Sequence, residues 1–457
     1  MNDQQGRELP FSARQVVPGQ LSYRQLSSRQ LGSPQLRRSR RRFVTGQLSY
    51  RQLSSRQLGS PQLGSPQLGS PQLRRSRRRF VKGISLLVIA SLLLVLELNT
   101  HLNHHGQQPT LTRQAAFSSQ AALIASQVDN LLTNKATHQQ FSGSVLIAHD
   151  DQVLLRKGYS MADWGKQVPN TPHTKFYLGS TTKQFTAMAI LILQERGKLQ
   201  VHDHICSYIA PCPPAWQPVT IHELLTHTSG IPELDGKSLS NASLQSWINR
   251  FDGVPLAFAP GSEFSYCNVC YQILGYVVEK VSGEPYSKFL QQTIFDPLQM
   301  RNTGYDPRYL SLPDHSVGYA SWHVQDVSIG WDVAPQWSFL FGAGLLYSTV
   351  EDLYRWNQTL SSHALISQQL LDEAFTPYVA SQYAGSSYGY GWFIAKAPTP
   401  GHRLIWHDGR VNGFRTYNGR YPDDGVTIIF LSNLSTLDEL ALARALEQIV
   451  FAHLDRA

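Results

Sequence analysis

The sequence predicts an α/β (α+β) fold in which helices cover an antiparallel sheet and an all-helical region is inserted, after a disordered tail and one apolar segment. Alternating apolar residues predict a strand pair over about 145–155 and a second pair over 411–432, at the two ends of one domain. Between them, residues 211–380 are mainly helical in pattern and rich in loops. Strands at both ends of a helical middle favour a single sheet built from both ends of the domain.

The formal net charge of +8 comes from the N-terminal part of this 457-residue chain. Residues 1–82 hold 17 basic and 2 acidic residues, whereas 83–457 hold 23 and 30. Residues 46–81 repeat the string at 19–44 with two extra GSPQL units, and Leu is the only frequent apolar residue there. Such a segment cannot bury enough surface to offset its ordering entropy, so we predict that 1–82 is a disordered basic repeat tail. The acidic remainder argues against a nucleic-acid partner.

An uninterrupted apolar run of 13 residues, 84–96, follows the tail. It has the length of a signal-peptide core and is short for a membrane span of about 20 residues. We expect 83–98 to be an uncleaved membrane anchor, with cleavage as the alternative, and the arginine-rich side to stay in the cytoplasm while the rest is exported. The paired arginines of 76–82 resemble a twin-arginine export signal, but we favour a generic basic flank, because the apolar core that follows is more hydrophobic than twin-arginine substrates usually carry.

The remaining elements follow in order. Residues 99–136 are expected to be a polar linker and, from 117 to 135, a first helix with one apolar face; the main domain is 137–457. The segment 180–196 is apolar nearly all round and therefore a central buried helix. Ser348-Thr-Val-Glu351 matches a capping box that begins another helix, and a last helix is expected over 436–454.

The first motif with reactive side chains is Ser180-Thr-Thr-Lys183, at the start of the buried helix. Residues three apart share a helix face, so the Ser180 hydroxyl and the Lys183 amine can meet. An amine that has lost its proton can take the serine's proton, and burial lowers a lysine pKa toward that state. Free N–H groups at a helix start can also stabilise an oxyanion. Alone, the pattern is weak, and an ordinary serine N-cap followed by a surface lysine is the better explanation.

The second and third motifs lie far along the chain. Tyr266 can relay a proton and Asn268, two residues on, can orient both Lys183 and a substrate carbonyl. His407-Asp408-Gly409 is placed at a strand edge, where a backbone N–H can supply a second oxyanion donor and Gly409 lets substrate approach closely. We expect His407 to polarise the tyrosine or to bind a substrate carboxylate. A core tyrosine with a turn asparagine, and a surface histidine in a turn, are the ordinary explanations.

Together the motifs carry a family resemblance over about 137–457. The chain resembles the serine β-lactamase and penicillin-binding-protein family, in its class C, D,D-peptidase and esterase branch. Five segments in the family's order carry this likeness: LGSTTKQFTAMAILILQERGKLQVHD, VTIHELLTHTSGIP, FSYCNVCYQILGYVVEKVSGEPY, AGLLYSTVEDLYRW and HDGRVNGF. The resemblance implies a β-lactamase/transpeptidase-like sandwich with an additional all-helical region.

It also implies a mechanism. An acyl-enzyme would form on Ser180, Lys183 and Tyr266 would share the base and acid work, and no metal or other cofactor would take part. Asn268 and His407 would contact the substrate, Gly409 would let it approach, and the backbone N–H groups of Ser180 and Arg410 would form the oxyanion hole.

The third motif departs from the class C pattern, which carries Lys-Thr-Gly where this chain has His-Asp-Gly. The permanent charge for a β-lactam carboxylate is lost, so we expect an exported serine hydrolase acting on D-peptides or esters. A true β-lactamase and a non-catalytic cell-wall peptide-binding protein are the alternatives. Arg410 could supply the carboxylate contact instead. Expected partners are a small-molecule or peptide substrate, such as a peptidoglycan stem peptide, and the membrane; we expect a monomer.

Three further expectations concern single residues. His227 is tempting as a base, but the resemblance places it in a loop with a structural role. Asp408 is expected at a solvated or strand-edge position. Cys206 and Cys212 can close a small loop by a disulfide, whereas helical geometry disfavours a bond between Cys267 and Cys270.

Overall fold

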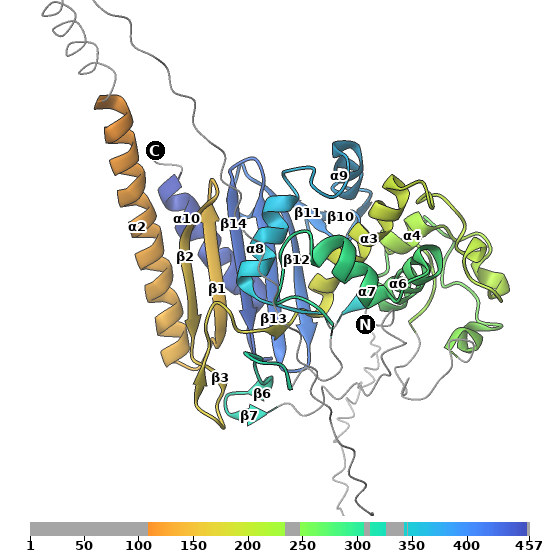
Figure 1. Ribbon diagram of the computed structural model, residues 1–457, viewed down its shortest axis with the longest axis horizontal. Coiled ribbons are helices and arrows are strands. Elements are labelled where there is room, and N and C mark those ends of the chain that lie inside the picture. Colours follow the sequence, from red (N-terminus) through yellow and green to blue (C-terminus); the bar gives the residue numbers. More distant parts are fainter. Residues whose placement is uncertain (1–107, 234–246, 306–310, 326–341, 345, 455–457) are drawn as a thin grey trace, which may run out of the picture. The chain divides into compact units, whose positions relative to one another are not determined.

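The computed structural model describes residues 108–454 except 234–246, 306–310, 326–341 and 345, and for 108–118 the backbone alone (Figure 1). The predicted basic tail and the apolar segment lie outside these residues. Within the described part of the chain, no helix is long and apolar enough to cross a membrane.

One eight-stranded antiparallel sheet forms the centre of the fold, as the sequence predicts. In space the strands follow the order β2-β1-β14-β13-β12-β11-β10-β9, so the first strands of the domain pair with the last (Figure 1). The strands are β1 (Gly143–His149), β2 (Gln152–Tyr159), β9 (Val379–Ala380), β10 (Ser386–Tyr388), β11 (Phe393–Lys396), β12 (Arg403–Val411), β13 (Phe414–Tyr421) and β14 (Val426–Ser432).

The hairpin of β1 and β2 turns at Asp150 and Asp151. Both residues have positive φ, 46° and 62°. A two-residue hairpin turn of the favoured twist needs this conformation at both positions, and aspartate tolerates it better than most residues. The expected antiparallel hairpin is therefore confirmed, together with its turn.

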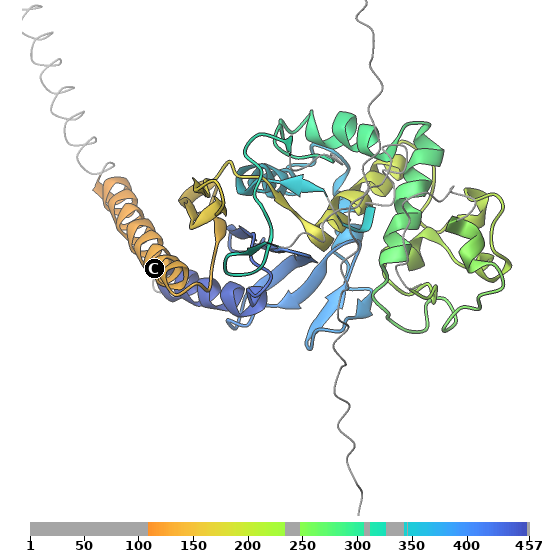
Figure 2. The ribbon, with the colours of Figure 1, turned by 90° about the horizontal axis from the view of Figure 1, so that it is seen from below.

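Side chains alternate between the two faces of the sheet. Val145 belongs to a core under α2 (Gln108–Thr137) and α10 (Glu439–Leu454), which lie together on one face (Figure 2). Leu146, the next residue, belongs to the larger core that contains α3 (Lys183–Glu195) and α8 (Val350–Thr359) on the other face. Helix α2 begins at Gln108, so nine residues expected to be linker are helical. The buried central helix is confirmed as α3.

The helical region lies beyond α3, between the two sets of long strands. Its helices are α4 (Ile221–Leu225), α6 (Asn268–Ser282) and α7 (Tyr286–Leu290). Helix α8 (Val350–Thr359) instead packs on β1 and β14, and α9 (Gln368–Ala374) follows it along the chain. The short helices are η1 (Gly179–Thr182), directly before α3, and η2 (Ile205–Ser207), η3 (Pro214–Trp216), η4 (Asn249–Phe251) and η5 (Gln291–Phe295) after it. The structure also has three short strand pairs: β3 (Met161–Asp163) with β4 (Val168–Pro169), β5 (Phe176–Tyr177) with β8 (Tyr347–Ser348), and β6 (Tyr319–Ser321) with β7 (Val324–Gln325).

The capping box predicted at Ser348 is displaced by one residue. Ser348 belongs to β8, whose pairing with β5 keeps it extended, and Thr349 caps α8 by accepting from the Asp352 N–H at 3.2 Å. Glu351 instead forms an ion pair with Arg156 at 2.6 Å. Sheet pairing therefore decides where this helix begins.

Candidate active site

Ser180 lies in η1, a single tight turn that leads directly into α3. Gly179 precedes it with φ 54°, in the left-handed region that favours glycine. A Cβ at Gly179 would lie 2.6 Å from the backbone nitrogen of Arg410. Glycine at this position thus lets the serine turn approach β12 more closely than any other residue could.

Lys183 is fully buried beneath the serine. Its Nζ lies 2.7 Å from the Ala343 carbonyl, 2.9 Å from Asn268 Oδ1 and 3.1 Å from Ser180 Oγ. The carbonyl and the amide oxygen can only accept, so they take both hydrogens of a neutral amine. The remaining lone pair then faces the Ser180 hydroxyl, which is the arrangement that a general base requires.

The charge state of Lys183 supports this geometry. Burial lowers the pKa of Lys183 to about 7, although the Glu233 and Asp408 carboxylates raise it in part. A substantial fraction of the amine is therefore unprotonated at neutral pH, when an exposed lysine is almost fully charged.

Tyr266 completes the reactive group. The Lys183 Nζ lies 4.7 Å from the centre of its ring. The buried hydroxyl of Tyr266 has no hydrogen-bond partner among the described residues. Burial raises the pKa of Tyr266 well above its ordinary value, and the nearby Ser180 hydroxyl only partly opposes that shift. The phenol therefore keeps its proton at neutral pH and can donate it, whereas Lys183 is the group able to accept one.

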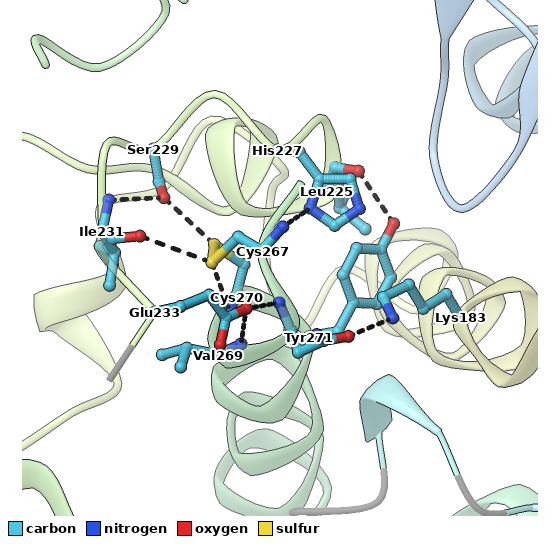
Figure 3. Close-up of a disulfide and its surroundings, with 11 residues drawn as sticks. Lys183, Leu225, His227, Ser229, Ile231, Glu233, Cys267, Val269, Cys270 and Tyr271 are labelled. Atoms are coloured by element: carbon cyan, nitrogen blue, oxygen red, sulfur yellow. Dashed lines mark hydrogen bonds between the residues drawn. A yellow bond between two sulfur atoms is a disulfide. The ribbon is translucent and has the colours of Figure 1, made fainter. Parts of the chain in front are cut away.

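Asn268 is the first residue of α6, and Cys267 is its N-cap. Cys267 has extended backbone angles, φ −131° and ψ 109°, and its sulfur accepts from the Cys270 N–H at 3.0 Å. Because Cys267 stands outside the helix, its Cα lies 5.3 Å from that of Cys270 and the two form a disulfide (Figure 3). The prediction against this bond is wrong, since it assumed helical geometry for both residues. The Cys206–Cys212 disulfide is present as the sequence allowed.

The third motif lies within β12. Strand β11 pairs with only the first four residues of β12, up to Trp406, so His407 to Arg410 have no strand neighbour on that side. Gly409 faces the serine turn, because a Cβ there would lie 1.9 Å from the Leu178 carbonyl oxygen. The backbone nitrogen of Arg410 lies beside the same turn, since it is the atom that a Cβ at Gly179 would meet at 2.6 Å.

His407 is buried, with 1% of its surface exposed. Its Nδ1 lies 2.6 Å from the Asp408 carbonyl oxygen and its Nε2 lies 3.0 Å from the Tyr388 hydroxyl. A carbonyl can only accept, so Nδ1 carries the proton and Nε2 accepts from Tyr388. Burial, together with the Lys183 charge, lowers the pKa of His407 to about 3. The imidazole is therefore neutral, and neither nitrogen is free for a substrate carboxylate.

The side chains of Asp408 and Arg410 point to the opposite face of the sheet. The Arg410 guanidinium bonds to Glu439 at the start of α10 and lies 3.4 Å from the Asp408 carboxylate. It is therefore engaged away from the serine and does not offer the suggested carboxylate contact. Asp408 lies in the strand as expected, but only 6% of its surface is exposed. The expectation of a solvated side chain is therefore wrong. Burial raises its pKa to about 6, with Glu439 adding to the shift.

Two residues near Ser180 carried no recognised sequence signal. Glu233, directly after the LLTHTSGIP string, accepts through Oε1 from the N–H groups of Asn268 and Val269. Tyr388 orients His407, but it stands in an otherwise ordinary strand. His227 has the expected structural position: it is fully buried and its Nδ1 accepts from the Cys267 N–H at 3.0 Å. Within the described ranges, no three metal-ligating side chains lie close enough to hold an ion.

Comparisons with known proteins place this chain beside a group of related proteins. The model of the Beta-lactamase family matches residues 125–451. Penicillin-binding protein 4* of Bacillus subtilis is 32% identical over 332 residues, which cover 68% of this chain and 73% of that protein. The octameric penicillin-binding protein homologue from Pyrococcus abyssi has a TM-score of 0.64 and 26% identity, with 72% of this chain and 77% of that one covered. A penicillin-binding protein from Bacillus halodurans has a TM-score of 0.61 and 26% identity, with 70% and 98% covered.

Proposed function

The chain belongs to the beta-lactamase family, and we propose that it is a serine hydrolase that forms an acyl-enzyme on Ser180 and acts on D-peptide or ester bonds. The observation that carries this proposal is the hydrogen bonding of Lys183. Both hydrogens of its neutral amine are occupied by acceptors, and its lone pair faces Ser180.

Acylation begins when Lys183 takes the proton of the Ser180 hydroxyl and the oxygen attacks the substrate carbonyl. The negative charge that develops on the carbonyl oxygen is stabilised by the backbone N–H groups of Ser180 and Arg410. Asn268 uses Oδ1 for Lys183, which leaves its Nδ2 hydrogens for the acyl group of the substrate. The Tyr266 phenol donates its proton to the departing amine or alcohol and regains one from Lys183.

Deacylation repeats these steps with water in place of serine. Lys183 removes a proton from the water, which attacks the ester carbon. The second tetrahedral intermediate collapses, the Ser180 oxygen recovers a proton, and the acid product leaves. No proton carrier beyond these residues is needed to balance the two half-reactions.

The choice of substrate rests on His407. A neutral, internally bonded imidazole gives no fixed positive charge for the carboxylate of a β-lactam. Peptide or ester hydrolysis is thus favoured over β-lactam hydrolysis, which remains the second candidate. A peptidoglycan stem peptide is the natural form of such a D-peptide. A non-catalytic peptide binder would not need the unprotonated amine that burial creates at Lys183.

We also propose that the domain acts outside the cytoplasmic membrane, with 1–82 inside the cell and 83–98 as the anchor. The charge difference between the tail and the rest of the chain supports this orientation. Protease treatment of intact spheroplasts should digest the domain and spare an epitope tag at the N-terminus. Protection of both ends would contradict the proposal, and a protein without its N-terminal tag in the medium would indicate cleavage.

The enzymatic proposal is tested by trapping the acyl-enzyme on residues 108–457. Intact-mass measurement after mixing with a D-alanyl ester or a penicillin should give one adduct, located on Ser180 and missing in Ser180→Ala. Hydrolysis of a substrate panel at equal rates by the wild type and Ser180→Ala would contradict it.

A further inference from the structure

A cavity separate from the active site lies under the end of α8. Helix α8 packs on β1 and β14 (Figure 1), and the cavity is lined by its second half, the loop after it and the adjacent ends of β1, β13 and β14. Its volume of about 610 Å³ is in the range of small-molecule sites. Its lining residues include no residue of the three motifs around Ser180, and most of their side chains are polar. A ligand that fills this cavity would therefore be hydrophilic.

Arg420, near the end of β13, contributes a buried cation to the wall of this cavity. Only 5% of its surface is exposed. Its Nη2 donates to Ser361 Oγ at 2.8 Å, and its guanidinium lies 5.4 Å from the centre of the Phe375 ring. Arg420 and Ser361 both line the cavity, so the guanidinium group reaches it at this contact. A guanidinium has five N–H donors, and the others of Arg420 have no hydrogen-bond partner among the described residues.

The charge of Arg420 is not compensated within the described chain. No carboxylate of that part of the chain forms an ion pair with it. Burial lowers the pKa of Arg420 to about 10, and the like charge of Arg403 adds to the shift. The guanidinium is nevertheless charged at neutral pH. A buried charge without a counterion is costly, so an anionic group bound in the cavity would be stabilised by Arg420 and would stabilise it in turn.

The other charged side chains that line the cavity do not take this role. Asp150 and Asp151, in the turn between β1 and β2, are exposed, so solvent screens their charges. The guanidinium of Arg355 is already bonded to the Asp352 carboxylate at 2.6 Å. Among the described residues that line the cavity, Arg420 is therefore the cation without an anionic partner, and an anion entering the cavity would bind there.

Hydroxyl groups surround the place where an anion would bind. Thr359, Ser361 and Ser362 line the cavity from the end of α8 and the loop after it. The Thr359 and Ser362 hydroxyls donate to backbone carbonyls, at 2.9 Å and 3.0 Å, so their lone pairs remain for donors from a ligand. A guanidinium binds phosphate and carboxylate groups through paired N–H donors. The lining thus combines a site for one anionic group with acceptors for the hydroxyl groups of the same molecule.

We propose that this cavity binds a small hydroxylated anion, such as a sugar phosphate or a sugar acid, whose anionic group pairs with Arg420 and whose hydroxyl groups bond to the side chains of 359–362. The site is distinct from the one at Ser180, and the proposal does not depend on the reaction proposed there.

The test is hydrogen exchange of the full chain, followed by mass spectrometry of its peptides, with glucose 6-phosphate, glucuronate and uncharged glucose as probes. Because the basic segment 1–82 also attracts anions, binding must be located by peptide. We expect at least one of the two anions to slow exchange in peptides that cover 350–362 and 415–427, and glucose to have no effect. Protection by only one anion would show whether the site takes a phosphate or a carboxylate. Protection by neither, or equal protection by glucose, would overturn the proposal.

Two variants assign the binding to Arg420. Arg420→Gln removes the charge, and we expect the affinity for the anion, from a titration of the same protection, to fall by about 10- to 100-fold. Ser361→Asp puts a carboxylate beside Nη2, so it should also abolish binding and raise the melting temperature by about 2–4 °C.

Arg403→Gln is the matched control, because that guanidinium pairs with Asp423 at 3.0 Å and is half exposed. Its affinity should stay within about threefold of the wild type. If Arg420→Gln does not fold, Ser361→Asp decides the question. Wild-type affinity in Ser361→Asp, or in a folded Arg420→Gln, would overturn the proposal.

Discussion

Buried titratable side chains have opposite pKa shifts on the two sides of strand β12. Facing Ser180, Lys183 and His407 are buried against hydroxyl, amide and carbonyl oxygens, and burial lowers both pKa values. Facing α10, Arg410 pairs with Glu439 and Asp408, and its pKa is raised by Glu439 despite burial.

The difference separates reactivity from stability. A buried nitrogen without a bonded carboxylate loses its charge, and its lone pair becomes available for proton transfer. A paired group stays charged and attaches the strand to a neighbouring helix. Substitutions on the Ser180 side should therefore affect the rate, and those on the α10 side should affect the free energy of unfolding.

The largest effect is expected from Lys183→Met, which keeps the length of the side chain and removes the base. We expect kcat to fall by about 10³- to 10⁴-fold, the upper range for loss of a general base. Lys175→Met is the control, because Lys175 is also buried but its Nζ donates to the Pro313 carbonyl at 2.9 Å, away from the serine. A loss below tenfold in Lys183→Met would exclude the amine as the base.

Tyr266→Phe should have the next largest effect, and its size should depend on the leaving group. An amine must be protonated to leave, so we expect about a 10²- to 10³-fold loss on amides. A phenolate leaves without help, and aryl esters should lose less than about tenfold. Tyr271→Phe, whose hydroxyl donates to the Leu225 carbonyl, serves as control. Equal losses on both substrate types would remove Tyr266 from the proton path.

Glu439→Gln addresses the other face of the strand. Glu439 is buried and pairs with Arg410 and, at 3.9 Å, Arg415. Both guanidinium groups are partly exposed, so we expect a destabilisation of only about 1–3 kcal/mol, with kcat within threefold of the wild type. Urea unfolding gives the first value and steady-state kinetics the second. An unchanged free energy of unfolding combined with a large rate loss would contradict the division between the two faces.

The smallest predicted effect is a shift in pH dependence. The Glu233 carboxylate raises the pKa of Lys183, so its removal in Glu233→Gln should lower that pKa and move the acid limb of the rate profile to lower pH. We expect a shift of less than about one pH unit, since the side chain is exposed and screened by solvent. A shift to higher pH would show that the carboxylate acts on another group.

Much of the fold could be predicted from the sequence where a local pattern decides the structure. Val145 to Leu155 alternate around an Asp-Asp turn, and the apolar helix after Ser180 has no face for solvent. The start of α8 could not be predicted to the residue, because sheet pairing of Ser348 with Phe176 overrides the local capping preference. The Cys267–Cys270 bond was missed for a related reason, since its possibility depends on where α6 begins.

The candidate site was predictable as a set of residues and less so as a set of contacts. Ser180, Lys183, Tyr266 and Asn268 meet because two segments converge, which motif spacing could indicate. The engagement of His407 by Tyr388 depends on the neighbouring strand and has no local signal. Glu233 depends on a loop that returns to the start of α6. Such contacts arise from tertiary packing and cannot be inferred from spacing along the chain.

The central claim is that an unprotonated Lys183 activates Ser180. It is tested most directly by the pH dependence of Ser180 acylation in a single turnover, followed by intact mass. The account predicts one adduct on Ser180 whose rate of formation rises with pH through a midpoint near 7, the pKa to which burial lowers Lys183. A rate that is constant from pH 5 to 8, or an adduct on another residue, would contradict it.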